Sequence, residues 1–217
     1  MKRRSVLAGS CIVLAIVLMQ AFVGCTSTGY QQAEKSVLSM NVTRQELVSA
    51  KSQVTRTSRA LDAVVNGQGN LVPKYEHFGQ ELKDLDKAAK QARWRADRMQ
   101  KDTTRYFDGW AKDIGKIQDP QMKSQSMQRR SKAIRSYNGV IKSMFDIGDD
   151  YVPLLSNFND IQISLKQDLT SSGVKSIAPQ VNKARQDSAG LQRGIDTLMA
   201  EIDRVSAEWA PEGSGQY

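Results

Sequence analysis

The chain has 217 residues, of which 40% are hydrophobic and 25% charged, with only 5 prolines and a formal net charge of +8. Three of these charges precede residue 25, and a chain without them would carry +5, which argues against a dedicated nucleic-acid binder. Aromatic residues make up only 6%, which argues against a large globular core. The remaining mix, rich in Gln, Ser, Lys and Asp, suits long amphipathic helices.

The N-terminus has the pattern of a bacterial secretion signal. Basic residues at 2–4 precede a nearly uncharged apolar run over 6–23, which is the order typical of a signal peptide. We therefore predict a signal peptide over 1–24. Two alternatives remain open, ordinary signal-peptidase cleavage near Gly24 and an uncleaved anchor of about 18 apolar residues.

Cys25 is the predicted site of lipid attachment. The run Phe22-Val23-Gly24-Cys25 resembles the bacterial lipobox, although Phe22 stands where leucine is usual. Cys11, the only other cysteine, lies within the signal, so the mature chain would retain no free thiol and no disulfide. Two or three acyl chains would anchor the protein firmly. Because Thr26 rather than Asp follows the cysteine, we expect an outer-membrane lipoprotein of the cell envelope, facing the periplasm.

The rest of the chain divides at three turn signals of the Gly, Pro, Asn or Ser kind, at 66–70, 119–120 and 171–173. We predict a lipidated tether over 25–32, a helical domain over 33–210 and a disordered tail over 211–217.

Between these turns, apolar residues recur at alternating intervals of three and four, the spacing of helices that pack side by side. In the first segment they are Met40, Thr43, Leu47, Ala50, Val54, Thr57, Leu61 and Val64. In the second they are Tyr75, Phe78, Leu82, Leu85, Ala89, Ala92, Ala96, Met99, Thr103, Tyr106, Trp110, Asp113 and Ile117, with Ile114 able to replace Asp113. In the third they are Met127, Ile134, Tyr137, Ile141, Met144, Gly148, Tyr151, Leu155, Phe158, Leu165 and Leu169, with polar interruptions at Arg130 and Gln162. In the fourth they are Val174, Ile177, Val181, Ala184, Ser188, Leu191, Ile195, Leu198, Ile202, Val205 and Trp209.

These registers predict an all-α fold, an elongated antiparallel bundle of four long helices with coiled-coil-like heptad packing. The small residues Ala89, Ala92 and Ala96 should let the first helix approach the second closely. Pro153 should kink the third helix, or end it so that a new helix begins there.

No residue constellation points to catalysis. His77 is the only histidine, which excludes His-based metal clusters and Ser-His-Asp arrangements. We interpret it as a solvated residue, and Gly67 and Gly69 as a turn rather than a phosphate loop. Three pairs of acids could do acid–base chemistry in a cleft but fit a solvated helix face better: Asp84/Asp86, Asp149/Asp150 and Glu201/Asp203. We expect no metal, no cofactor and no enzymatic activity.

Basic residues gather on both sides of the turn at 119–120, so a hairpin could align them in one band. The candidate interaction patch in this band comprises Arg93, Trp94, Arg95, Arg98, Arg129, Arg130 and Arg135. Trp94 lies off the apolar register between two arginines, as an exposed aromatic or an inter-subunit contact would. Two interpretations remain open, an ordinary solvated surface and a surface for anionic lipid head groups or another acidic envelope polymer.

Several short runs resemble domain of unknown function 2959, a bacterial family of exported helical proteins. They are Tyr106-Phe107-Asp108-Gly109-Trp110 with Ile114, Arg130-Ser131 with Tyr137, Pro153-Leu154-Leu155, Phe158-Asn159-Asp160 and Leu165-Lys166-Gln167-Asp168-Leu169. The resemblance covers roughly residues 35–207. It implies a helical, coiled-coil-rich exported protein and supplies neither an activity nor functional residues.

The sequence therefore predicts a non-catalytic, lipid-anchored envelope protein that acts as a structural or adaptor bundle for an unknown protein partner. The alternative is a bundle that binds anionic lipid through the basic band around Arg93–Arg135. Thr43 and Thr57 leave the first register underfilled, which favours self-association. Nucleic acid is not an expected partner.

Overall fold

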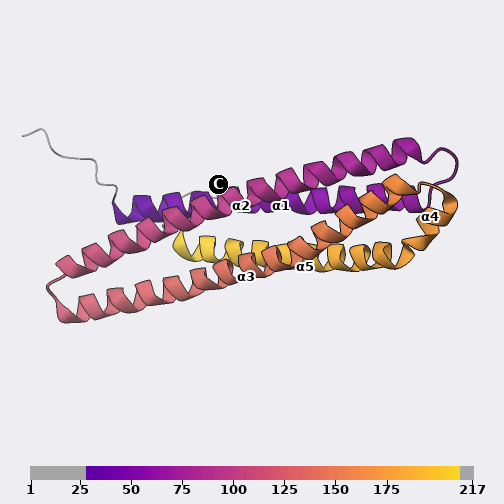
Figure 1. Cartoon of the computed structure of the whole chain (residues 1–217). Coiled ribbons are helices and arrows are strands. Elements are labelled where there is room, and N and C mark those ends of the chain that lie inside the picture. Colours follow the sequence, from indigo (N-terminus) through magenta and orange to yellow (C-terminus); the bar gives the residue numbers. More distant parts are fainter. Residues whose placement is uncertain (1–27, 211–217) are drawn as a thin grey trace, which may run out of the picture.

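The computed structural model describes residues 28–210, and this part of the chain is all-helical (Figure 1). The predicted all-α class is confirmed, but five helices pack together rather than four: α1 (Gly29–Val65), α2 (Val72–Lys116), α3 (Pro120–Gln167), α4 (Ser171–Ser176) and α5 (Ala178–Trp209). The predicted signal peptide, Cys25 and the tail over 211–217 lie outside the described residues.

Local signals explain where the first and third helices begin. The Thr28 backbone N–H donates to Gln31 Oε1 at 2.9 Å, and α1 starts at Gly29. Residues 29–32, predicted as tether, are therefore helical. At the start of α3, Asp119 Oδ1 accepts the Met122 backbone N–H at 2.7 Å. Pro120 opens this helix, where its missing N–H costs nothing.

The prediction of one unbroken fourth helix from Val174 onward is wrong. The short α4 ends at Ser176, and α5 starts at Ala178 with Pro179 in its first turn. Pro179 has no N–H, and its ring crowds the carbonyl four residues earlier, so it fits the first turn of α5, where no N–H is needed, better than the interior of a longer helix. The turn before α4 also lies earlier than predicted, at 168–170, where the Thr170 side chain caps α4.

The long helices pack in pairs along their length. α1 contacts α2 and α5, and α3 contacts the same two helices. Lys51 Nζ lies 2.6 Å from Asp196 and Arg185 Nη2 lies 2.7 Å from Asp62, so residue numbers rise along α1 as they fall along α5. Within the described residues, no helix combines the length and apolar character needed to cross a bilayer.

The buried side chains of α1 and α5 follow the predicted registers. All eight register positions from Met40 to Val64 are buried, and so are all eleven from Val174 to Trp209. In α2 only six of the thirteen register positions are buried, and Phe107 is buried in place of the half-buried Tyr106. Ile114 is buried in place of the exposed Asp113, as predicted.

The register predicted for α3 is wrong at every second position. Met127 is 54% exposed, and the side chains that are buried lie one residue earlier than expected. They are Ser126, Ala133, Val140, Leu154 and Ile161 in place of Met127, Ile134, Ile141, Leu155 and Gln162. The interposed positions Tyr137, Phe158 and Leu165 are buried as predicted.

Pro153 lies inside α3 without ending it. The alternative of a new helix beginning there is therefore wrong. Pro153 and Asp149, whose carbonyl would accept the missing N–H, are both exposed, so water can satisfy that carbonyl. In Figure 1 the ribbon of α3 rises more steeply in its orange C-terminal part than in its pink N-terminal part.

Small and polar residues hold α1 close to α2. Thr57 Oγ1 lies 3.1 Å from the Glu81 carbonyl oxygen, and Thr43 Oγ1 lies 3.4 Å from that of Arg95. Both threonines are at most 1% exposed. α2 therefore fills the space at these two positions, and the small side chain of Ala96, next to Arg95, lets it approach. The two threonines thus leave no gap in the register for a second copy of the chain.

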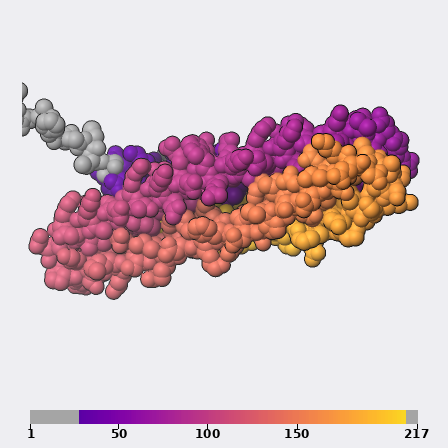
Figure 2. Space-filling view, in the orientation of Figure 1, coloured from indigo at the N-terminus to yellow at the C-terminus, as the bar shows by residue number. Residues whose placement is uncertain are grey.

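The hairpin of α2 and α3 extends beyond the other helices at one end of the rod. Ser136 Oγ donates to Glu208 at 3.2 Å, which places the end of α5 level with residue 135 of α3, and Gly29 shares a groove with Asp113. We call residues 111–135 the overhang. In Figure 1 it projects past the indigo start of α1 and the yellow end of α5, and in Figure 2 its pink atoms form the tip of the molecule.

Candidate functional site

The α2 half of the predicted interaction patch is built around Trp94. The Trp94 side chain is 50% exposed, and the guanidinium carbons of Arg95 and Arg98 lie 4.7 and 5.3 Å from its ring centroid, within cation–π range. Arg95 Nε also lies 3.4 Å from Glu46 Oε1 of α1. Arg93 is exposed and forms no ion pair with the described residues. The structure thus brings together Trp94, Arg95 and Arg98.

The α3 half of the patch lies further along the rod. Arg130 Nε donates to the Phe107 carbonyl at 2.9 Å, which places it level with Phe107 of α2. Arg93 lies 14 residues before Phe107, or about 21 Å along the axis. The two halves are therefore staggered along the axis and do not form the single aligned band that was predicted. Arg129 and Arg135 are exposed and have no ion pair in the described part.

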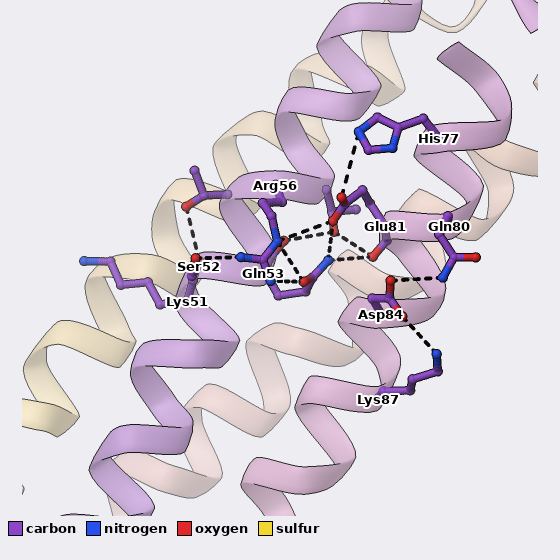
Figure 3. Close-up of polar contacts among 11 residues, drawn as sticks. Lys51, Ser52, Gln53, Arg56, His77, Gln80, Glu81, Asp84 and Lys87 are labelled. Atoms are coloured by element: carbon purple, nitrogen blue, oxygen red, sulfur yellow. Dashed lines mark hydrogen bonds and ion pairs between the residues drawn. The ribbon is translucent and has the colours of Figure 1, made fainter. Parts of the chain in front are cut away.

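A buried polar network joins α1 to α2 around Glu81 (Figure 3). Gln53, only 3% exposed, donates through Nε2 to the Glu81 carbonyl at 2.9 Å and to Oε2 at 2.6 Å. Arg56 Nε lies 3.6 Å from the same carboxylate and also bonds Gln53 Oε1. His77 Nε2 lies 3.8 Å from Glu81 Oε1, and its side chain is 62% exposed. The network ties two helices together, and its open edge is solvated.

The paired acids lie on solvated helix faces, and three of them are ion-paired. Asp84 accepts hydrogen bonds from Gln80 at 3.0 Å and Lys87 at 2.9 Å, and these bonds lower the pKa of its carboxyl (Figure 3). Asp86 pairs with Lys90 at 2.6 Å. The remaining acids are bonded or exposed: Asp203 pairs with Arg44, Glu201 accepts from Ser143, and Asp149 and Asp150 are exposed. In residues 28–210 no group of three or more metal-binding side chains gathers.

An aromatic cluster joins α2, α3 and α5 at the base of the overhang. The Trp209 ring lies 5.7 Å from Tyr106, 5.3 Å from Phe107 and 5.8 Å from Tyr137, measured between centroids. Burial raises the pKa of Tyr137 to about 12. Trp110 Nε1 donates to Ser126 Oγ at 3.1 Å and ties α2 to α3.

A groove of about 280 Å³ opens beside this cluster. Its lining comprises Gly29, Tyr30, Ala33, Tyr106, Trp110, Asp113 and Trp209. Trp209 Nε1 is buried and has no hydrogen-bond partner among the described residues. The groove therefore lies where the described chain begins and ends.

Sequence patterns did not point to the Glu81 network or the groove. Gln53 is polar and stands beside the register residue Val54, so the periodicity predicts that it lies on the surface. Tyr106 and Trp110 were assigned to the register, but the meeting of Tyr30 and Trp209 depends on how three helices align. The only signal was the concentration of aromatic residues over 106–110.

The geometry defines an elongated, all-helical protein whose long helices are joined by buried polar contacts. Within this class, the chain belongs to the family described as "Protein of unknown function (DUF2959)", which matches residues 22–208. The predicted resemblance is thus confirmed over a slightly longer stretch. Searches of curated proteins and of solved structures gave no match.

Proposed function

We propose that this chain is a non-catalytic, lipid-anchored protein of the cell envelope that serves as a structural or adaptor rod. Cys25 would carry the lipid, and Thr26 favours the outer membrane with the rod in the periplasm. The observation that carries the proposal is the position of the first described helix. α1 begins at Gly29, four residues after Cys25, so an anchor would hold the rod by one end.

The rod has the dimensions of a spacer. We propose that its four long helices form an antiparallel bundle with heptad-type packing, kinked in α3 near Pro153. α3 alone has 48 residues and spans about 72 Å. Anchored at one end, such a rod would present its polar faces to a partner well away from the membrane surface.

A protein partner is favoured by the surface around Trp94. A half-exposed tryptophan flanked by arginines is typical of the residues that dominate protein interfaces. The acids that could serve in acid–base chemistry are instead exposed or ion-paired, which supports a binding role over a catalytic one.

Metabolic labelling with a palmitate analogue tests the anchor. We expect label in the wild-type protein and in Cys11→Ala, but not in Cys25→Ala, which should also appear in the soluble envelope fraction. Label that persists in Cys25→Ala would sink the lipid half of the proposal.

Photocrosslinking in cells tests the partner. A photoreactive residue at position 94 should capture a discrete species, and the charge reversals Arg93→Glu and Arg98→Glu should abolish the capture. The matched control is Val72 of α2, which is equally exposed at 50% and lies 22 residues, or about 33 Å, before Trp94 on the same helix. Equal capture from positions 72 and 94 would contradict a specific surface. Sedimentation equilibrium of the mature protein would show whether the captured species is a second copy.

A further inference from the structure

The overhang is the more basic of the two ends of the rod. It contains seven lysines and arginines and two aspartates, a net charge of +5. The opposite end of the rod, residues 59–80 and 157–187, contains six basic and five acidic residues, a net charge of +1. The charge of the rod is therefore polarised along its axis.

Most cations of the overhang lack an acidic partner among the described residues. Lys116 pairs with Asp113 at 2.7 Å, while Asp119 is engaged as the helix cap of α3. The other six form no ion pair with any described residue: Lys112, Lys123, Arg129, Arg130, Lys132 and Arg135. Elsewhere on α2, Lys87 and Lys90 are matched by acids one helical turn away, whereas Arg93 and Arg98 form no ion pair with a described residue. The overhang thus carries positive charge that no acidic side chain of the described residues pairs with.

The overhang has little core of its own. Its buried side chains are Ile114, Ser126 and Ala133, because neither α1 nor α5 extends far enough to cover it. Two methionines are instead exposed near its tip, Met122 at 61% and Met127 at 54%. A basic hairpin with exposed flexible apolar side chains suits an interface between water and lipid.

The place where a lipid would attach lies at the same end. Gly29 and Tyr30 line the groove with Trp110 and Asp113 at the base of the overhang. Four residues can span at most about 14 Å, so acyl chains on Cys25 would hold this end of the rod near the bilayer. Tyrosine and tryptophan, which line the groove, are the residues enriched at membrane interfaces.

We infer that the overhang is a membrane-docking surface that rests on an anionic phospholipid bilayer and orients the anchored rod. The orientation rests on the proposed anchor at Cys25. Each lysine or arginine near an anionic bilayer surface contributes attraction that salt screens. Met122 and Met127 would enter the head-group region, while Trp94 and the far end would remain in water.

A fluorescent probe at three positions tests this inference in the mature, full-length protein reconstituted on vesicles. An environment-sensitive dye is attached through Met122→Cys at the tip, Trp94→Cys on the side or Gln68→Cys at the far end. On vesicles containing anionic phosphatidylglycerol, the dye at position 122 should shift to the blue and be protected severalfold from iodide quenching. Neutral phosphatidylcholine vesicles, or high salt, should remove the effect. The dyes at 94 and 68 should not respond.

Charge reversal supplies the matched control. The variant Lys112→Glu/Lys123→Glu/Arg129→Glu/Lys132→Glu should lose the response at position 122. The variant Arg59→Glu/Lys166→Glu/Lys175→Glu/Arg193→Glu has the same change in net charge and alters cations that also form no ion pair with a described residue. It should keep the response at position 122. Circular dichroism would show that both variants remain helical.

Three outcomes would overturn the inference. The first is no response at position 122 on anionic vesicles at low salt. The second is an equal response at 94, which means side-on contact through the Arg93–Arg98 stretch. The third is a response at 122 that rises with protein concentration without lipid, which means a second copy covers the overhang. Palmitate labelling reports separately on the anchor. If the protein carries no lipid but the dye at position 122 still responds, the anchor proposal is wrong and the docking surface stands.

Discussion

Gln53 satisfies more polar groups than any other buried side chain at the α1–α2 contact. Its amide donates to both the carbonyl and the carboxylate of Glu81, and its oxygen accepts from Arg56. Removing it would leave a mostly buried carboxylate without its nearest donor. Buried charged groups are costly when unpaired.

We therefore expect Gln53→Ala to lower the free energy of unfolding by about 2–3 kcal/mol. Urea denaturation followed by circular dichroism would measure the change. Gln45→Ala, at an exposed position on the same helix, should change it by less than about 0.5 kcal/mol. Equal effects of the two substitutions would show that the Glu81 network contributes no stability.

Tyr137 makes stability sensitive to high pH. Burial raises its pKa to about 12, whereas a tyrosine in the unfolded chain titrates near 10. The folded state holds the proton longer, so this contribution is intact below pH about 10 and is lost as the pH rises towards 12. The loss from this residue should reach about 2 kcal/mol at pH 12.

Tyr137→Phe removes the ionisable group and should make the alkaline fall in stability correspondingly smaller. The Tyr137 hydroxyl is buried, and its hydrogen-bonding neighbour is the Thr103 hydroxyl, so the substitution should change stability at pH 7 by less than about 1 kcal/mol. Urea unfolding at pH 7 and at pH 11 checks both parts. An identical alkaline fall in the two proteins would contradict the assignment.

At the scale of the helices, α3 shows where sequence periodicity does not determine which residues are buried. Apolar residues stand next to each other at 140–141 and 154–155, so either member of a pair can continue the alternating spacing. The correct choice had a signal, since Ile147 and Ile161 fill positions at which the predicted register put Gly148 and Gln162. α1 and α5 lack such neighbouring alternatives at most positions, and their registers were predicted correctly.

The pair Leu154 and Leu155 tests the observed register. Leu154 is fully buried, and Leu155 is only half-buried. Leu154→Ala should therefore cost about 2–5 kcal/mol, because it opens a cavity in the core, and Leu155→Ala should cost distinctly less. Thermal and urea unfolding of both variants would rank them. If Leu155→Ala cost more stability than Leu154→Ala, the register predicted from the sequence would be correct and the observed one wrong.

Pro153 and Pro179 occupy opposite positions in their helices. Pro153 interrupts the hydrogen bonding inside α3, whereas Pro179 lies in the first turn of α5. Alanine at 153 should therefore stabilise the protein by about 1–2 kcal/mol, after allowance for the looser unfolded chain. Alanine at 179 should be neutral or slightly destabilising. A loss of stability in Pro153→Ala would mean that the bend it causes is needed for packing.

At the scale of the whole molecule, the sequence predicted the helical class and the three main turns but not the ends. The offset between helices is set by side chains that meet across them, such as Ser136 with Glu208 and Arg130 with Phe107. Helical periodicity in one segment carries no information about that offset. The overhang, the staggered basic residues and the aromatic groove all depend on it, and none was foreseen.

The elongated shape predicts a scattering profile unlike that of a globular protein. A rod of about 72 Å should have a radius of gyration of about 22 Å, whereas a compact chain of this size would have about 17 Å. Small-angle X-ray scattering of the mature protein in detergent-free, unlipidated form would distinguish them. A radius of gyration near 17 Å would mean that the protein in solution is compact rather than rod-shaped.

The meeting of Gly29 and Trp209 in one groove also makes the order of the helices along the chain open to rearrangement. A short linker could join the two ends there, and new ends could be opened at the opposite tip, in the exposed turn at Gln68 and Gly69. Such a circular permutant would keep every interhelical pairing while moving the attachment point to the other pole of the molecule. It would show whether the function of the rod depends on the order of its helices along the chain or on which end is attached to the membrane.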